Sequence, residues 1–289
     1  MKSIGFIGAG RLGTAFGLYL MRREIQVAGY YSRTYAHSKD AADLLGGEVQ
    51  AFCTLEELLE RSDWVAIAAN DGAIAQIAET IAGSEAHIKG KVVFHMSGAA
   101  TSALLAPLAN KGALVASLHP LQSFADGISG ARAMEEAVFG VEGDSEAVVC
   151  LSKWVKNLGH TYFVLDAEYK PLYHAAASVA SNSLAGVIGY AVELMMKTGM
   201  DEEKSLSALS PLIKTTVCNV LDKGAARALT GPVVRGDVGT VAMHLQALDK
   251  MNPELVSFYK ELGKLTLATA KREQLRDGNV ICQLNKLLE

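Results

Sequence analysis

Three glycines near the N-terminus have the spacing of a dinucleotide-binding loop. Gly8, Gly10 and Gly13 form G-x-G-x-x-G between an apolar, strand-like segment and a helical pattern that begins at Arg11 and Leu12. In such a loop the first glycine permits a tight turn, the second lets backbone N–H groups approach a pyrophosphate, and the third lets the helix lie close to the sheet. The positive helix N-terminus would face the pyrophosphate. A glycine-rich turn in another α/β fold is the alternative, and the strand-loop-helix context favours the cofactor site.

The end of the next apolar segment indicates which dinucleotide binds. NAD enzymes carry an Asp or Glu about 20 residues after the glycine loop, where it bonds the ribose 2′-hydroxyl. Ser32 and Arg33 occupy this place instead, at the end of segment 26–33. A hydroxyl and a guanidinium suit a 2′-phosphate, so we expect NADP rather than NAD. Alternatively, Arg33 is a solvated residue at a strand end.

Further candidate residues follow other predicted strands. In an open α/β sheet, ligands bind at the carboxyl ends of the strands. Ala69 and Asn70 lie at the end of segment 64–69, so we expect them to contact the cofactor. Ser97 and His119 lie at later strand ends and would face the nicotinamide. There, a hydroxyl can hold a substrate carbonyl or carboxylate, and a histidine suits acid–base catalysis.

Some of these polar residues also have a structural interpretation. His119 could instead be a buried core histidine or cap a strand end, and this alternative is preferred for His95. Asp71 is expected to cap the helix that follows it.

A polar face is predicted on the first long helix after the strands. Lys170, His174, Ser178 and Asn182 recur every four residues, which places them on one side of a helix over 169–198. Polar side chains on so apolar a helix either face the substrate cleft or form buried hydrogen bonds between helices. We expect the cleft, with the buried network as the alternative.

A third candidate lies between later helices. The glycine-rich segment 230–240 leads into a helix start whose N–H groups could receive a substrate carboxylate. We expect Gly239 and Thr240 to contribute to this site, with Arg235 as the counter-charge. The alternative is a salt bridge between Arg235 and Asp237 that closes the loop.

These candidates require a sheet that brings the strand ends together. Apolar, β-rich segments alternate with helical ones, which predicts an α/β fold with a doubly wound, mostly parallel Rossmann sheet. After the first two strands, the predicted strands are 48–52, 64–69, 92–97, 114–121, 137–143 and 161–166, and the later helices are 169–198, 201–223, 239–250 and 253–272. We therefore expect a Rossmann domain over residues 1–167 and an all-helical domain over 168–289.

The composition indicates a soluble protein with no nucleic-acid partner. The 289 residues carry a net charge of −4 and no basic stripe. Four scattered cysteines without a C-x-x-C pair predict neither a metal site nor a disulfide framework, and hence a cytoplasmic protein. Segment 172–192 has no formal charge and could cross a bilayer by length, but its Ala, Ser and Gly content favours a fully buried core helix or a subunit-interface helix.

Several motifs occur together along essentially the whole chain. They are the glycine loop, the Ser-Arg end of the second strand, Leu118-His119-Pro120-Leu121-Gln122-Ser123-Phe124, Tyr173-His174-Ala175-Ala176-Ala177, Ser181-Asn182, Thr230-Gly231-Pro232 and Arg235-Gly236-Asp237, with Thr240 and His244-Leu245. As a set they resemble a bacterial oxidoreductase family that joins a Rossmann-like domain to a C-terminal domain of unknown function.

More distantly, the chain resembles pyrroline-5-carboxylate reductase in the 6-phosphogluconate dehydrogenase-like superfamily. Segment 238–242 falls at the substrate segment of that reductase, although the reductase's Gly-Ser-Gly-Pro is absent. Ser97 and His119-Pro120 fall where prephenate dehydrogenases have a serine and a catalytic His-Pro. These resemblances imply a 6-phosphogluconate dehydrogenase-like helical domain, a small carboxylate-bearing substrate, and a homodimer with interleaved helical domains.

Together these observations predict an NADP-dependent oxidoreductase. It would transfer a hydride between nicotinamide C4 and a C=O or C=N carbon, with His119 or His174 as the proton donor. Lys170 or an ordered water is the remaining candidate donor. A function of a different class is a non-catalytic NADP(H)-binding sensor or structural protein, and turnover of any substrate would distinguish the two.

Overall fold

The computed structural model describes residues 2–289 of the chain. These residues divide into two compact units, 2–186 and 187–289. This division falls inside a helix, whereas the expected domain boundary after residue 167 marks the end of the last predicted strand. The observed division reflects how densely the residues contact one another, whereas the expected boundary reflects where the strands end. The expected boundary therefore stays a prediction.

The first unit is built on one sheet. Within residues 2–289, eight strands pair in the order β3-β2-β1-β4-β5-β6-β7-β8. Their bounds are β1 Ile4–Ile7, β2 Val27–Tyr31, β3 Gln50–Ala51, β4 Trp64–Ile67, β5 Val92–His95, β6 Leu114–Leu121, β7 Val138–Gly143 and β8 Tyr162–Val164. All neighbours are parallel except β6 and β7, which run antiparallel. The doubly wound, mostly parallel Rossmann sheet is therefore confirmed.

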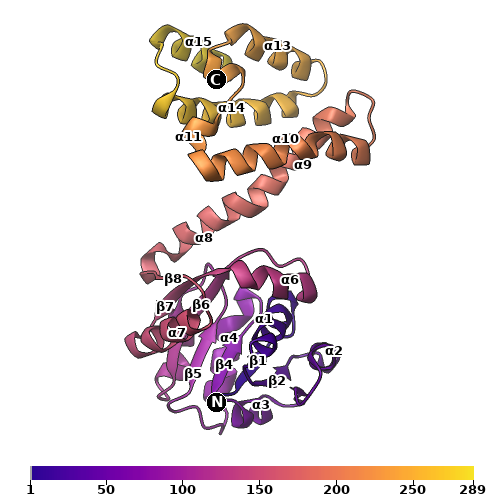
Figure 1. Cartoon of the computed structure of the whole chain (residues 1–289). Helices are drawn as coiled ribbons and strands as arrows, with labels where there is room; N and C mark the ends of the chain where they lie inside the picture. The colour runs from indigo at the N-terminus through magenta and orange to yellow at the C-terminus, as the bar shows by residue number, and fades with distance from the viewer. Residues whose placement is uncertain (1) are drawn as a thin grey trace. The chain divides into compact units, whose positions relative to one another are not determined.

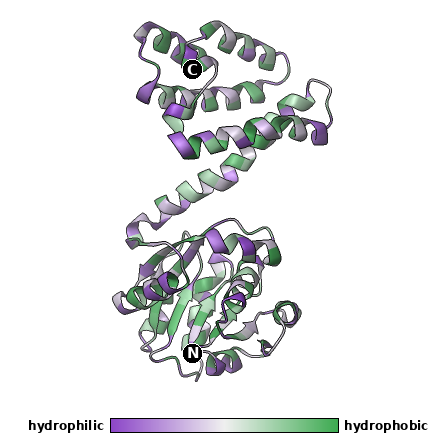
Figure 2. Ribbon diagram, in the orientation of Figure 1, coloured by the Kyte–Doolittle hydropathy of each residue, from purple (hydrophilic) through white to green (hydrophobic). Residues whose placement is uncertain are grey.

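Helices cover both faces of this sheet (Figure 1). The helices α1 (Arg11–Arg22), α6 (Gly127–Ala133) and α7 (Ser145–Asn157) share one apolar cluster with the strands. The helices α3 (Leu55–Arg61), α4 (Asp71–Gly83) and α5 (Ala106–Ala109) share a second cluster. Alternate residues of each strand point to opposite faces, so Trp64 packs into the first cluster and Val65 into the second. In Figure 2 the strands accordingly form a hydrophobic layer between the helices.

The rest of the chain is helical apart from short connections. The remaining helices are α2 Tyr35–Leu45, α8 Lys170–Ser178, α9 Leu184–Met196, α10 Glu202–Lys223, α11 Ala225–Ala228, α12 Pro232–Arg235, α13 Val238–Asp249, α14 Pro253–Glu273 and α15 Gly278–Leu288. A π-helical turn, η4 (Val179–Ser183), joins α8 to α9. Short 3-10 turns are η1 Ser102–Leu105, η2 Met134–Glu136 and η3 Ala167–Tyr169. The helix expected over 169–198 thus contains one turn of a different pitch.

The second unit has a small core of its own. Its buried members include Val241, Leu267, Ala270 and Leu284, which come from α13, α14 and α15. Side-chain caps begin several helices of this unit: Asp201 accepts a bond from the Lys204 N–H before α10, and Asn252 accepts one from the Glu254 N–H before α14. The last helix, α15, was not expected; it begins at Gly278, directly after its N-cap Asp277.

The uncharged helix segment 172–192 is mostly exposed in the single chain. Leu172 is 71% exposed and Val179 63% exposed. The expectation of a fully buried core helix is therefore wrong for one chain, while the subunit-interface alternative stays a prediction. By length and composition only, one described helical stretch, Ala167–Met196, could cross a membrane, and 6% of its most apolar window is buried.

Candidate active site

The loop after β1 needs two of its three glycines for packing. Gly8 has φ +106°, and a Cβ there would lie 2.5 Å from the carbonyl oxygen of Ala68. A Cβ on Gly13 would lie 2.5 Å from the carbonyl oxygen of Gly8. Both contacts are too short for any side chain, so the tight turn and the close approach of α1 depend on glycine.

Gly10 has no such packing reason. Within residues 2–289, no atom outside Gly10 and its two chain neighbours lies within 4 Å of the position that its Cβ would take. Gly10 is the N-cap of α1, provides no side-chain cap, and is followed by no acid in the first turn. The first N–H groups of α1, at Arg11 and Leu12, therefore remain available for an anion. Packing does not require a glycine at position 10. Its lack of a side chain therefore fits a loop that leaves room for a pyrophosphate.

A cleft of about 730 Å³ opens at this loop. It lies where the ends of β1, β2 and β4 meet α2 and α4, and its lining includes six of the expected cofactor residues, Gly8, Gly10, Ser32, Arg33, Ala69 and Asn70. Arg11, Leu12 and Gly13 are not part of the lining. His37 and Thr80 line the cleft and were not expected.

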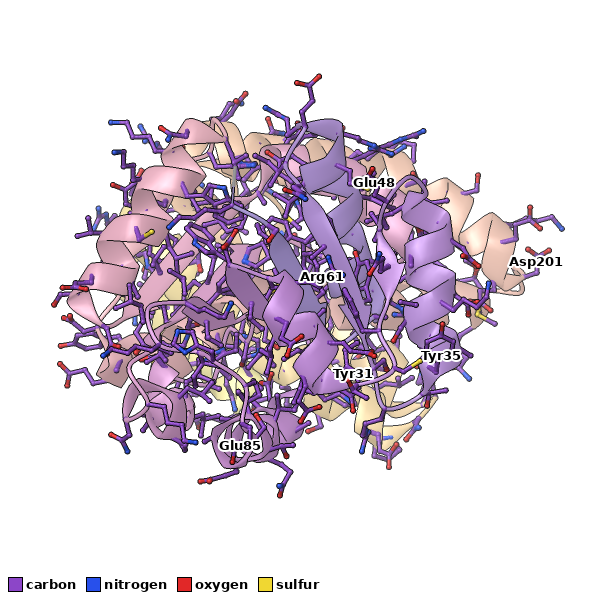
Figure 3. All side chains as sticks on the ribbon, turned by 90° about the horizontal axis from the view of Figure 1, so that it is seen from below. Tyr31, Tyr35, Glu48, Arg61, Glu85 and Asp201 are labelled. Carbon is purple, nitrogen blue, oxygen red and sulfur yellow. The ribbon has the colours of Figure 1, made fainter. Side chains whose placement is uncertain are left out.

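The β2–α2 turn presents a positive, uncapped edge to this cleft. Arg33 is exposed and forms no ion pair with any described residue. Thr34 is the N-cap of α2 without a side-chain bond, and the first turn of α2 holds no acid. Tyr31 and Tyr35, labelled in Figure 3, flank the turn. These features fit a 2′-phosphate at Ser32 and Arg33.

The start of α4, directly after β4, differs from the expectation that Asp71 caps this helix. Asn70, not Asp71, is the N-cap of α4, and no side chain caps this helix. Asp71 is instead the first residue of α4, where a negative charge is favourable for the helix dipole. The expected cap role of Asp71 is therefore wrong.

A second polar group lies at the ends of β5 and β6. His95 is fully buried, and its Nε2 lies 3.0 Å from the carbonyl oxygen of Thr101. Its Nδ1 accepts a bond from the Ser97 N–H at 3.3 Å. With both ring nitrogens paired, His95 has the structural role that the sequence favoured. Burial lowers the pKa of His95, which keeps the ring neutral.

Ser97 is buried at the turn after β5. Its Oγ accepts bonds from the N–H groups of Ala99 at 3.2 Å and Ala100 at 2.9 Å. These bonds use the lone pairs and leave the hydroxyl hydrogen free to donate.

Lys170 is the most buried charged residue of the group, at 2% exposure. Its Nζ donates to Ser117 Oγ at 2.5 Å and to the Ser97 carbonyl oxygen at 3.2 Å. The nearest carboxylate is Glu142, 4.0 Å away, which also accepts bonds from the N–H and hydroxyl of Ser102. Burial lowers the pKa of Lys170 to about 8, and the Glu142 charge opposes this shift. Lys170 therefore joins a buried hydrogen-bond network.

His119 lies beside this network. Its Nδ1 is 2.6 Å from the Tyr173 hydroxyl, and its ring centroid is 6.1 Å from that of His174. A Cβ on Gly98 would lie 2.9 Å from His119 Nε2 and 2.5 Å from His174 Nδ1, so both rings converge on this glycine. Burial, followed by the charges of Lys170 and His174, lowers the pKa of His119 to about 4.

The structure brings together only part of the expected polar face. Lys170 and His174 belong to the group, but Ser178 is half-buried and Asn182 is exposed. Asn182 lies in the π-helical turn, where each turn holds an extra residue and the four-residue spacing no longer keeps side chains on one face.

The expected carboxylate site belongs to the second unit. Arg235 ends α12 and is exposed, while Gly239 and Thr240 lie in the first turn of α13. Asp237 caps α13: it accepts bonds from the Thr240 N–H at 3.0 Å and the Thr240 hydroxyl at 2.6 Å. No Arg235–Asp237 salt bridge occurs among the described residues, so that alternative is wrong.

Several residues of the site were not expected from the sequence. Gly98 and Ser117 carry no local signal of their own, and Tyr173 was given only as part of the motif shared with the related family, without a role. Glu142 did carry one, because a single acid inside the apolar strand β7 needs a buried partner.

Two domain models match the chain. Residues 1–120 match a Rossmann-like domain, and residues 137–266 match a domain of unknown function, DUF2520. No curated protein sequence matches the chain.

Solved structures share the fold over nearly the whole chain. Protein TM1727 from Thermotoga maritima is 26% identical, with TM-score 0.69, over 94% of this chain and 100% of that one. Protein BF3122 from Bacteroides fragilis, provisionally assigned as an NADP oxidoreductase, is 22% identical, with TM-score 0.75, over 92% and 98%. Pyrroline carboxylate reductase from Plasmodium falciparum, with NADP bound, is 13% identical, with TM-score 0.62, over 100% and 98%. The chain therefore joins a Rossmann-like domain to a DUF2520 domain and shares its fold with pyrroline carboxylate reductase.

Proposed function

We propose that the protein is an NADP-dependent oxidoreductase that transfers a hydride between the nicotinamide and a C=O or C=N carbon of a small, carboxylate-bearing substrate. The observation that carries the proposal is the cleft at the glycine loop, in which Gly10 leaves space that no protein atom uses and Arg33 has no ion-pair partner among the described residues. A polar group suited to acid–base chemistry lies at the ends of β5 and β6 in the same unit.

The cofactor would be held by residues of the first unit. The N–H groups of Arg11, Leu12 and Gly13 at the start of α1 would bind the pyrophosphate, and Ser32 with Arg33 would bind the 2′-phosphate. Ala69 and Asn70 are further candidate contacts. The nicotinamide supplies or accepts the hydride when NADP is bound.

The pKa of His119 limits its role in proton transfer. Burial lowers this pKa to about 4, so the ring is neutral at pH 7. We therefore assign His119 as a neutral hydrogen-bond donor to the substrate and His174 as the proton donor. Ser97 would hold the substrate through its free hydroxyl hydrogen, and Lys170 would supply positive charge to the site.

The rest of the proposal concerns further substrate contacts, the oligomeric state and the location of the protein. Arg235, Gly239 and Thr240 would receive the substrate carboxylate, and Asn182 would contact the substrate from the long helix. We propose a cytoplasmic homodimer with no nucleic-acid or membrane partner.

One observation favours a non-catalytic NADP(H)-binding protein as the second candidate function. Lys170 and Ser117 bond to each other, and His119 bonds to Tyr173, so much of the polar group is satisfied within the protein. Such a group could stabilise a sensor without reacting.

Cofactor titration tests the nucleotide assignment. NADPH should bind about ten- to a hundredfold more tightly than NADH, because a 2′-phosphate paired with arginine contributes roughly 1.5–3 kcal/mol. Arg33→Ala should remove most of this preference, whereas Arg61→Ala, which changes an arginine outside the cleft, should not. Equal affinities for the two cofactors in the wild-type protein would contradict the assignment.

Turnover then separates the two candidate functions. NADPH oxidation is measured against 2-oxo acids, cyclic imines and branched ketoacids. His174→Asn should lower the rate by about 10²–10⁴ with cofactor affinity unchanged. Tight NADPH binding without turnover of any compound would favour the sensor.

A further inference from the structure

A short chain of contacts holds the His119 ring in one orientation. Its Nδ1 lies 2.6 Å from the Tyr173 hydroxyl, and the two rings meet edge to face with centroids 5.6 Å apart. The direction of this hydrogen bond decides which nitrogen of His119 carries the proton.

The Tyr173 hydroxyl is better suited than His119 Nδ1 to be the donor. Within residues 2–289 it has no other hydrogen-bond partner, so a bond in the opposite direction would leave its hydrogen unpaired in a half-buried place. Burial also raises the pKa of Tyr173 to about 12, so the hydroxyl keeps its proton. His119 Nδ1 therefore accepts, and the proton of the neutral ring lies on Nε2.

Tyr173 is itself held in place by the sheet. Gly140 on β7 stands directly opposite His119 on β6. A Cβ on Gly140 would lie 3.3 Å from the Tyr173 hydroxyl, so the absent side chain gives this hydroxyl room to reach His119. The ring of Phe163 packs against the Tyr173 ring, with centroids 5.5 Å apart.

The free side of the His119 ring faces the end of β5. The Cβ position of Gly98 is 2.9 Å from His119 Nε2 and 2.5 Å from His174 Nδ1. His174 Nδ1 is buried and has no partner among the described residues. One turn of α8 thus provides both the residue that orients His119 and the second imidazole, because positions 173 and 174 share the face of position 170.

We propose that Tyr173 is a positioning residue that fixes His119 as the Nε2–H tautomer, so that a hydrogen-bond donor points to the carbonyl oxygen or imine nitrogen of a substrate beside Gly98. This inference rests on the proposed function for the identity of the site. Gly98 and Gly140 both support this arrangement, since a side chain at position 98 would displace an imidazole ring and one at position 140 would crowd the Tyr173 hydroxyl.

Histidine ¹⁵N NMR tests the tautomer without a substrate. The wild-type, full-length protein should show neutral His119 with the proton on Nε2 at pH 7, with the signal assigned by its loss in His119→Asn. Tyr173→Phe should mix the two tautomers. Tyr19→Phe is the matched control, because Tyr19 bonds His160 Nε2 at the same distance of 2.6 Å and should leave the His119 signal unchanged. Gly140→Ala is a second route to the same effect and should also perturb His119.

Kinetics provide the second measurement once a substrate is found. Tyr173→Phe should lower kcat by about ten- to a hundredfold, as loss of a ring-orienting partner does for metal-ligating histidines, with the Kd for NADPH unchanged. An Nδ1–H tautomer in the wild-type protein, or an unchanged His119 signal in Tyr173→Phe, would overturn the inference. Absence of NADPH binding would instead overturn the proposed function, and the NMR result does not depend on it.

Discussion

Lys170 carries its charge at a position that water scarcely reaches. Its ammonium group is paired with two neutral oxygens and faces one carboxylate, Glu142, at 4.0 Å. A buried ammonium loses hydration, so its neutral form becomes easier to reach, and a nearby carboxylate restores part of the preference for the charged form. Glu142 thus helps to keep the positive charge in the candidate site near neutral pH.

Removal of the Glu142 charge should change the titration of Lys170. In Glu142→Gln we expect the pKa of Lys170 to fall below its wild-type value of about 8, because the carboxylate that opposes the effect of burial is gone. NMR titration of the lysine Cε–Hε signals measures this value. Glu146→Gln, on the exposed side of α7, is the control and should leave the value unchanged. A pKa that stays near 8 in Glu142→Gln would mean that the ion pair does not support the charge.

The contacts of individual side chains were the hardest to predict from the sequence. The four-residue spacing predicted that Lys170 and His174 share a helix face, and the structure places both in one polar group. The partners Glu142 and Tyr173 were not foreseen. The antiparallel register of β6 and β7 places Glu142 opposite Ser117 and Gly140 opposite His119, and no local pattern in the sequence encodes a register between separate strands.

Helix α1 begins without a side-chain cap, which makes the cofactor-free protein less stable. Cofactor binding at this helix end would explain the missing cap. Gly10 has extended backbone angles, φ −82° and ψ −175°, which suit a capping residue, and its Cβ position is free of neighbours. A glycine there leaves the positive end of the helix open to a ligand anion.

A capping residue at position 10 should make the cofactor-free protein more stable and should weaken cofactor binding. Gly10→Asp should stabilise the cofactor-free protein by about 0.5–1 kcal/mol, because the carboxylate interacts with the helix dipole and the unfolded chain loses freedom. The same variant should lose NADPH affinity, because a negative charge would occupy the pyrophosphate position. Thermal unfolding and cofactor titration measure the two effects, and Gly10→Ala separates backbone entropy from charge. Unchanged NADPH affinity in Gly10→Asp would remove the pyrophosphate from this loop.

At the scale of elements, the predicted strands lie within about two residues of the observed ones, because each is an apolar run between turn residues. The direction of β7 could not be predicted, since the composition of a strand does not say whether its neighbour in the sheet is parallel or antiparallel. The π-helical turn η4 was missed for a related reason: an extra residue in one turn leaves the apolar composition unchanged.

At the scale of the whole molecule, the apolar surface along α8 and α9 has no partner in the single chain. Leu172, Val179, Leu184 and Val187 are each more than 40% exposed. Several large apolar side chains exposed along one helical stretch are typical of an interface, because grouped apolar surface is rare on soluble monomers. The composition of segment 172–192 suggested burial, but a sequence cannot say whether the same chain or a second copy provides it.

A single glycine on this surface can distinguish a dimer from a monomer. Apart from its chain neighbours and the backbone of its own helix, no described atom lies within 4 Å of the Cβ position of Gly186, so a side chain can start there without a contact inside one chain. If a second copy packs on segment 172–192, the larger side chain should overpack the interface and weaken association, since overpacking costs about 1–3 kcal/mol. We expect the wild-type protein to sediment as a dimer at micromolar concentration and the variant to dissociate about ten- to a hundredfold more readily. Gly83→Leu, at an exposed position of α4 that is also free of neighbours, should leave the dimer intact. A monomeric wild-type protein would exclude the homodimer under these conditions and leave the apolar surface of α8 and α9 to a different partner.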